Sequence, residues 1–375
     1  MMSLALGLIH AHLQVAACSV PVFRYALERW APDIYQGVVF HDEDFSDDEI
    51  SWLAPFMDTP ETSNPLVNLN IETMDVNNPS DPNLLSLWEK RDTPSSPSLM
   101  VSYPQGHYSR TPFWTAPFNE ENIRQITDSP ARREIARRLL KGESAVWVLL
   151  ESGNVAKDQL ALNRLTERLD LLNDKLELPA LDPADIEDGF LSIEEEDLKI
   201  AFSTLSLSRK DPQESFFIQM LLGTEDDLKA FDEPMAFPIF GRGRALYALI
   251  GEGISDSVIE EACVFLTGAC SCEVKEQNPG VDLLMSVDWD HLVTRQFEVD
   301  RELPPLTGFV TLKEPAKTNQ HPESPQAPEM EPKPDTKTSL APPQDSPSVL
   351  LTTAIACAII GAAVLLGGFF FLSRK

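Results

Sequence analysis

Basic residues are scarce in this chain, and their shortage excludes two kinds of partner. Lys and Arg number 30 against 59 Asp and Glu among 375 residues, which gives a formal net charge of −29. A nucleic-acid-binding protein carries a basic patch, and a surface that binds anionic lipid broadly is basic as well. The sequence therefore predicts no nucleic-acid partner and no broad contact with an anionic membrane surface.

The signatures of common enzyme classes and metal sites are also missing. The chain contains no Gly-x-Ser-x-Gly elbow, P-loop or dinucleotide fingerprint. Its six histidines form no His-x-x-x-His or Glu-x-x-His pair, and its acidic runs lack the alternating spacing of a calcium-binding loop. We therefore expect no metal and no cofactor, and we favour a protein that is not an enzyme.

Charge is lacking altogether in the apolar segment 349–372, which ends just before Ser373, Arg374 and Lys375. At about 1.5 Å per residue, a helix of this length can cross about 30 Å of hydrocarbon. The segment 313–348 before it is rich in proline and polar residues, which bury too little apolar surface to fold. The sequence predicts a single transmembrane helix and a disordered linker that holds the body away from the bilayer.

The N-terminus indicates on which side of the membrane the body lies. Leu4–Val15 is mostly apolar, and small residues before Cys18 suit cleavage after Ala17 by a signal peptidase. The same positions resemble a bacterial lipobox, in which Cys18 would be lipidated. The lack of a basic residue before Arg24 counts against a signal segment.

Two basic residues at the end of the chain also bear on topology. Arg374 and Lys375 favour a cytoplasmic C-terminus by the positive-inside rule. We therefore expect a single-pass protein of the cell membrane with an extracytoplasmic body. The alternative is a tail-anchored protein whose body is cytosolic.

One order of predicted elements occurs twice, over 36–141 and 144–272. Each copy reads as a strand, a helix, a second strand, a second helix, a β-hairpin and a last helix. In the second copy, the predicted hairpin partner is 245–250, and the long helix 158–176 has an apolar stripe. That stripe is Leu160, Leu165, Leu169, Leu172 and Leu176.

This order is similar to that of a thioredoxin-like domain, so the predicted fold class is α/β with two tandem thioredoxin-like domains. Thioredoxin-like folds carry a cis-proline before the first hairpin strand, where this chain has Pro97 and Pro234. The full predicted organisation is a signal segment (1–17), an N-terminal helix (18–35), domain 1 (36–141), domain 2 (144–272), a C-terminal extension of the body (273–312), the linker (313–348) and the transmembrane helix (349–372).

Four segments resemble a family of uncharacterised bacterial membrane-anchored proteins with tandem thioredoxin-like domains. They are 17–30, 129–138, 144–151 and 270–280. The resemblance covers most of the predicted body. It implies a bacterial cell-envelope protein but no particular activity.

Cysteine is missing where a working thioredoxin needs it. The catalytic thiolate lies at the N-terminus of the helix after the first strand, where the helix dipole lowers its pKa. Neither 41–46 in the first copy nor 151–157 in the second contains a cysteine. Both copies are therefore predicted to be redox-inactive at that position.

The five cysteines that are present lie elsewhere. Cys357 falls in the predicted membrane helix and is interpreted as an apolar filler, and Cys263 as a buried thiol. Cys270 and Cys272 form a Cys-x-Cys motif that fits a structural disulfide, disulfide exchange or binding of a soft metal. The candidates for a structural disulfide are Cys18, Cys263, Cys270 and Cys272, with Cys18 the expected partner of the motif. The redox candidates are Cys270, Cys272 and Cys18.

One predicted helix concentrates basic charge in an otherwise acidic chain. It contains Arg132, Arg133, Arg137, Arg138 and Lys141. A solvated face explains them most simply. The alternative is a surface that docks an acidic partner or the acidic body itself.

Two hypotheses on function follow from these observations. The first is a membrane-tethered, redox-inactive binding or scaffold protein that holds a protein or peptide partner in grooves beside Pro97 and Pro234. The second is a thiol-disulfide exchange protein that uses Cys270 and Cys272. In both cases the membrane is contacted through the C-terminal helix.

Overall fold

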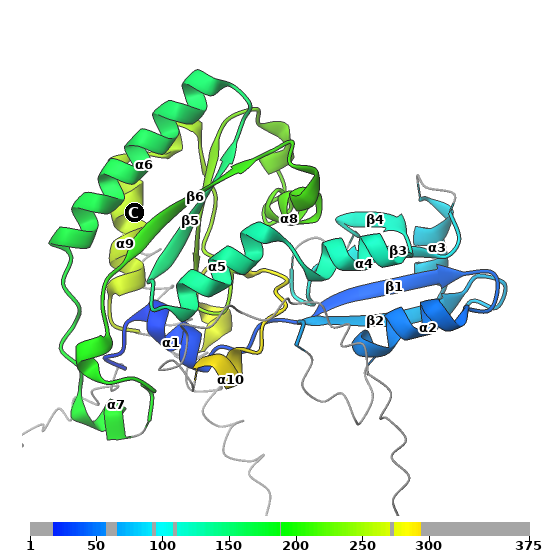
Figure 1. The fold of residues 1–375 in the computed structure, drawn as a ribbon, viewed down its shortest axis with the longest axis horizontal. Helices are drawn as coiled ribbons and strands as arrows, with labels where there is room; N and C mark the ends of the chain where they lie inside the picture. The colour runs from blue at the N-terminus through cyan, green and yellow to red at the C-terminus, as the bar shows by residue number, and fades with distance from the viewer. Residues whose placement is uncertain are drawn as a thin grey trace, which may run out of the picture. The chain divides into compact units, whose positions relative to one another are not determined.

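The computed structural model describes residues 18–57, 66–91, 95–107, 111–187, 189–270 and 274–293. The predicted signal segment, linker and membrane helix lie outside these ranges, as do Cys272 and Cys357. Within the ranges, every helix is too short or too polar to cross a bilayer. The described part is mixed α/β, with two β-sheets and helices packed on their faces (Figure 1).

The first sheet has four strands in the order β2-β1-β3-β4. β1 and β2 are parallel, and the β3–β4 hairpin is antiparallel to β1. The strands are β1 (Tyr35–His41), β2 (Leu69–Asp75), β3 (Ser98–Ser102) and β4 (Trp114–Pro117). The helices beside them are α2 (Asp47–Leu53), α3 (Pro82–Glu89) and α4 (Glu120–Thr127). α2 begins with a capping box, in which Ser46 and Glu49 cap each other.

The second sheet has the path β10-β8-β7-β5-β6, with β9 also paired to β7. β5 and β6 are parallel, whereas β7 is antiparallel to β5. The strands are β5 (Ala145–Glu151), β6 (Phe202–Ser208), β7 (Met235–Phe240), β8 (Arg244–Ala245), β9 (Leu249–Ile250) and β10 (Val281–Asp282). The remaining helices are α1 (Val22–Arg29), α5 (Pro130–Leu140), α6 (Val155–Lys175), α7 (Pro183–Glu187), α8 (Ser215–Leu221), α9 (Asp256–Thr267) and α10 (Trp289–Val293).

The predicted continuous hairpin partner 245–250 is wrong, because it is split into β8 and β9. Pro238 of β7 has no N–H to donate, and its carbonyl accepts from Leu246 N at 3.0 Å. The chain then leaves the ladder, where Ala248 N donates to Glu225 at 2.9 Å, and returns at Leu249. A proline inside the strand thus interrupts the pairing.

The two predicted cis-prolines differ. The Ser96–Pro97 peptide bond is cis, as predicted, and it is the one cis bond in the described ranges. The prediction for Pro234 is wrong, because its peptide bond is trans. There the carbonyl of Pro234 accepts from Gly251 N at 2.9 Å, and Met235 pairs with Ile250, so the chain enters β7 already extended.

One hydrophobic core joins the two sheets. Val39 and Leu99 of the first sheet belong to the same buried cluster as Val148 and Phe237 of the second, together with Phe216 next to the start of α8. Since these residues come from both halves of the chain, the sheets are stabilised by shared burial of apolar surface.

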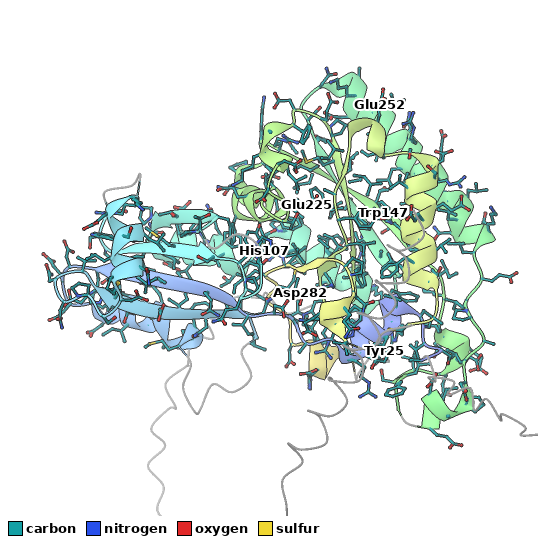
Figure 2. All side chains as sticks on the ribbon, turned by 180° about the vertical axis from the view of Figure 1, so that it is seen from behind. Tyr25, His107, Trp147, Glu225, Glu252 and Asp282 are labelled. Carbon is teal, nitrogen blue, oxygen red and sulfur yellow. The ribbon has the colours of Figure 1, made fainter. Side chains whose placement is uncertain are left out.

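A second core lies on the opposite face of the second sheet. There α6 and α9 pack side by side, with α1 against α9 (Figure 1). Trp147 is fully buried in this core, together with Phe23 of α1, Leu165 of α6 and Ile259 of α9 (Figure 2).

On the first sheet, Phe40 stacks on Trp88 of α3 with ring centroids 5.6 Å apart.

Candidate functional site

A cleft of about 850 Å³ opens beside Pro234, at the N-terminal end of α6. It lies between α6, the segment before β7 and the segment after β9. Its walls include Lys157, Leu160, Arg164, Phe231, Pro234 and Glu252. A space of this volume is within the size range of ligand-binding sites.

The cleft exposes apolar side chains that the core leaves out. Leu160 is 61% exposed and Phe231 is 38% exposed. The prediction that Leu160 belongs to the buried stripe of α6 is therefore wrong. Ala161 takes the buried position four residues before Leu165 and faces the sheet instead.

Polar contacts hold the walls of the cleft in place. Lys157 of α6 forms an ion pair with Glu233 at 2.5 Å. Arg209 donates to the carbonyls of Phe231 and Glu233, both at 3.0 Å. The loop that carries Phe231 is thus held by Arg209, just after β6, and by Lys157 of α6. These contacts fix the backbone from which the Phe231 ring extends.

The N-terminus of α6 has no chemistry of the kind a thioredoxin uses there. The Asn154 side chain accepts from Ala156 N at 3.2 Å and Lys157 N at 3.3 Å. Asp158 accepts from Ser152 N at 2.7 Å and Gly153 N at 3.0 Å. The amides at this helix start are therefore bound by the protein's own side chains, and no cysteine lies among them.

At the equivalent position in the first sheet, Pro97 is half-buried and its neighbours make contacts within the protein. Phe118 N donates to the carbonyl of Pro97 at 2.9 Å, and the Ser96 hydroxyl donates to Asp42 at 2.5 Å. Phe45 packs edge-on against Phe118 with ring centroids 6.3 Å apart. Of the two predicted groove prolines, Pro234 therefore lies in an open cleft, whereas Pro97 lies among internal contacts.

The cysteines lie away from this cleft, in the second core. Cys18, Cys263 and Cys270 are all buried there, each 2% exposed or less. The structure brings the segments of Cys18 and Cys270 together, since Cys270 N donates to Val20 O at 2.9 Å. Burial raises the pKa of the Cys263 thiol well above its ordinary value. None of the three side chains is placed to meet a substrate in solvent.

The basic helix α5 is not simply a solvated face. Arg132 is buried, and burial lowers its pKa to about 10. It donates to the carbonyls of Ile126 at 2.7 Å and Leu284 at 3.0 Å. Arg138 donates to Ser203 at 2.9 Å. The contacts of Arg132 and Arg138 therefore agree with the alternative in which basic residues of this helix dock onto the body itself. Arg133, Arg137 and Lys141 remain partly or fully exposed, as expected for a solvated face.

Sequence reasoning missed a buried glutamate next to this helix. Glu214 accepts from Ala131 N at 2.7 Å and from the Ser129 hydroxyl, so it caps α5. Burial raises its pKa, although the two hydrogen bonds and Arg132 oppose the shift. No local pattern around Glu214 indicates this contact, because its partners lie 83 and 85 residues earlier in the chain.

The cleft beside Pro234 thus combines exposed apolar side chains with the charged side chains of Lys157, Arg164, Glu233 and Glu252. The chain matches no protein-family model, and no curated protein matches it. The function of the site is inferred from its own residues.

Proposed function

We propose that this chain is a membrane-tethered, redox-inactive binding protein of the bacterial cell envelope, whose cleft beside Pro234 holds an extended polypeptide segment. The observation that carries the proposal is the exposure of Leu160 and Phe231 in a supported cleft of about 850 Å³. Apolar side chains held open to solvent favour a partner that buries them. The occupant is expected to present apolar side chains to this pair.

The strand order supports a thioredoxin-like origin for both halves. In each sheet a parallel strand pair has its first strand in the centre, and an antiparallel hairpin follows on the other side. This is the arrangement expected for the predicted tandem domains. Because the helix N-termini carry no cysteine, the protein would keep the binding groove of such a fold but not its redox chemistry.

The anchoring part of the proposal comes from the sequence. The apolar segment 349–372 supplies a membrane helix, and the proline-rich 313–348 supplies the spacer. An extracytoplasmic body is supported by the signal-like segment 1–17, with its expected cleavage site after Ala17. A tail-anchored protein with a cytosolic body is the alternative topology.

Exchange of disulfides through Cys270 and Cys272 is the competing function. A thiolate that attacks a disulfide must be accessible to its substrate. The Cys270 side chain is fully buried, which disfavours this function. Reduction of insulin by the full chain, abolished by changing Cys270 and Cys272 to Ser, would support it and contradict our proposal.

Binding to an array of ten-residue peptides tests the cleft directly. We expect the full chain to bind peptides rich in large apolar residues, and Leu160→Glu to weaken binding about tenfold, since burying one leucine contributes about 1.5 kcal/mol or more. Leu171→Glu is the matched control, because Leu171 is 48% exposed and lies outside the cleft, on the same helix. Equal binding by wild type and Leu160→Glu would refute the assignment of the cleft.

A further inference from the structure

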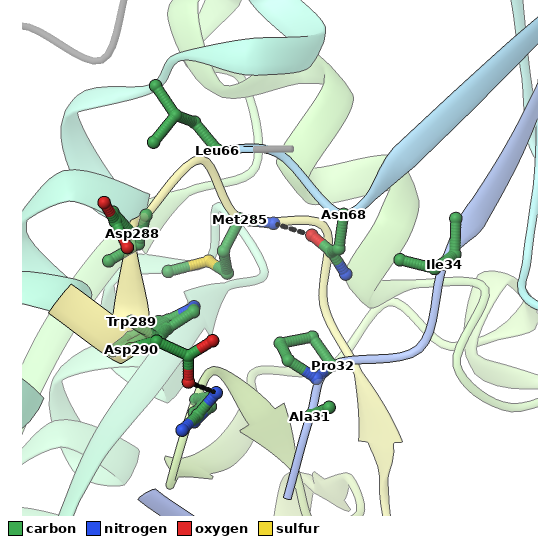
Figure 3. A pocket seen from close by; sticks show the side chains of 11 residues that line it. Ala31, Pro32, Ile34, Leu66, Asn68, Met285, Asp288, Trp289 and Asp290 are labelled. Atoms are coloured by element: carbon green, nitrogen blue, oxygen red, sulfur yellow. Dashed lines mark hydrogen bonds and ion pairs between the residues drawn. The ribbon is translucent and has the colours of Figure 1, made fainter. Parts of the chain in front are cut away.

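A second, smaller cleft lies on a different part of the body (Figure 3). It has a volume of about 160 Å³ and is formed by the segment before β1, the segment before β2, and α10 with the residues leading into it. Its apolar walls include Ile34, Leu66, Met285 and Trp289. Ile34 is 42% exposed and Leu66 is 55% exposed, so apolar surface continues from the cleft to the outside.

The polar group in the wall of this cleft is satisfied within the protein. The Asn68 side-chain amide donates to the carbonyl of Asp33 at 2.8 Å and to that of Leu283 at 3.2 Å. Its oxygen accepts from Met285 N at 2.7 Å (Figure 3). With Asn68 engaged in this way, the interior of the cleft offers mainly apolar contact to a ligand.

The mouth of the cleft is acidic. Arg242 is the basic residue there, and its side chain is only 10% exposed, because it donates to the carbonyls of Leu27 at 2.8 Å and Glu28 at 3.1 Å. Asp290 pairs with Arg242 at 2.7 Å but is 69% exposed, and Asp288 also lines the mouth. The carboxylate of Asp290 is therefore open to solvent, and that of half-buried Asp288 lies beside it and accepts from His291 N at 3.2 Å, whereas the guanidinium of Arg242 is largely buried.

We propose that this cleft receives one large apolar side chain of a partner protein, next to a Lys or Arg in the partner's sequence. The volume matches the size of a single ring, since an apolar cavity of about 150 Å³ holds benzene. The acidic mouth complements a neighbouring cation, and the net charge of −29 steers basic partners toward the molecule. The site is separate from the cleft beside Pro234.

Three biotinylated peptides on a biosensor surface test the proposal with the full chain in detergent. They carry Phe-Lys, Phe-Glu or Ala-Lys at the centre of the same Gly-Ser frame. We expect the Phe-Lys peptide to bind, and the other two to bind at least about fivefold more weakly, which corresponds to about 1 kcal/mol. Equal binding of the Phe-Glu and Phe-Lys peptides would refute the charge complementarity.

Two surface variants show whether the peptide binds in this cleft, and comparing them separates loss of binding from loss of folding. Leu66→Arg places a cation at the mouth of the cleft, so we expect it to weaken binding of the Phe-Lys peptide about fivefold. Ile50→Arg is the matched control, because Ile50 is 52% exposed on α2 and should leave binding unchanged. Loss of binding in Leu160→Glu but not in Leu66→Arg would assign the peptide to the cleft beside Pro234. Tighter binding of free 2-phenylethylamine than of the peptide would assign the cleft to a small amine. Either result overturns the proposal.

Discussion

At the scale of single residues, Asp282 is the clearest case of a buried charge that needs its partners. Its side chain, labelled in Figure 2, is 5% exposed. It pairs with Arg244 at 2.7 Å and with Lys275 at 2.8 Å. It also accepts from Asp33 N at 2.8 Å, while Lys275 reaches the carbonyl of Ala31 at 2.7 Å. This cluster ties β10 and the residues before it to the segment that leads into β1.

Removing the Asp282 charge should therefore be costly. We expect Asp282→Asn to lower the free energy of unfolding by about 3 kcal/mol, because Arg244 would remain buried without its counterion, while Lys275 would keep only its pair with Asp33 at 2.5 Å. Urea unfolding of the two proteins measures the difference. Glu233→Gln in the exposed Lys157–Glu233 pair is the control and should cost about 1 kcal/mol or less.

The same carboxylate predicts a pH dependence. Burial alone would raise the pKa of Asp282, but Arg244 and Lys275 outweigh it and hold the pKa below its ordinary value. The unfolded state therefore takes up the proton first, so this stabilisation is complete above about pH 4 and is lost as the pH falls further toward the folded-state pKa. Asp282→Asn should show a shallower loss of stability in that range. Parallel acid titrations of the two proteins would contradict the assignment.

At the scale of elements, α1 is built into the second core although it precedes the first sheet in sequence. The segment before α1 pairs with the residues that follow α9, where Pro21 and Ala269 form a β-bridge and Val22 N donates to Gly268 O at 3.0 Å. The turn after β7 accommodates α1 because Gly241 has a φ of +56°, and a Cβ there would lie 2.7 Å from Ala26 Cβ.

The backbone pairing of these two segments brings Cys18 near Cys270, which supports the predicted disulfide between Cys18 and the Cys-x-Cys motif. We expect the oxidised protein to join Cys18 to the Cys-x-Cys motif at 270 and 272, with two thiols losing two protons and two electrons to a disulfide oxidant such as oxidised glutathione. Non-reducing peptide mapping measures it, and Cys263 should remain a thiol because it is buried with a raised pKa. A Cys18 peptide carrying a diacylglyceryl mass would contradict the pairing and support lipidation.

At the scale of the whole described body, the shared core makes independent unfolding of the two sheets unfavourable. Tyr103 of the first half donates its hydroxyl to the carbonyl of Met220 in α8, inside the core that also contains Trp114 and Phe216. Separating the halves would expose these rings to water and remove this hydrogen bond. The two sheets should therefore behave as one cooperative unit.

We accordingly expect a single unfolding transition. Circular dichroism and tryptophan fluorescence should give the same midpoint in urea, because the tryptophans of the two halves, Trp114 and Trp147 among them, lose their packing together. Trp147→Phe removes the fluorescence signal of one tryptophan of the second sheet. In this variant the midpoints from circular dichroism and fluorescence should still agree. Two separated midpoints would show that the halves fold as independent domains.

The sequence was sufficient where local rules apply. The apolar strand β5, the capping box of α2 and the proline at the start of α5 each depend only on neighbouring residues, so local sequence is enough to account for them. The position of one candidate site was also predictable, since Pro234 lies in the open cleft. The split of β8 and β9 was visible in principle, because Pro238 lacks the donor that a continuous ladder needs.

The sequence by itself determined the acidic charge, the alternation of strands and helices, and the missing cysteines at both helix N-termini. Only the tertiary structure decided which proline opens into a cleft, that Leu160 is exposed while Ala161 is buried, and that Asp282 meets Arg244 and Lys275. These outcomes depend on contacts between residues far apart in the chain. Burial and ion pairing act through distance in space, which local sequence patterns do not encode.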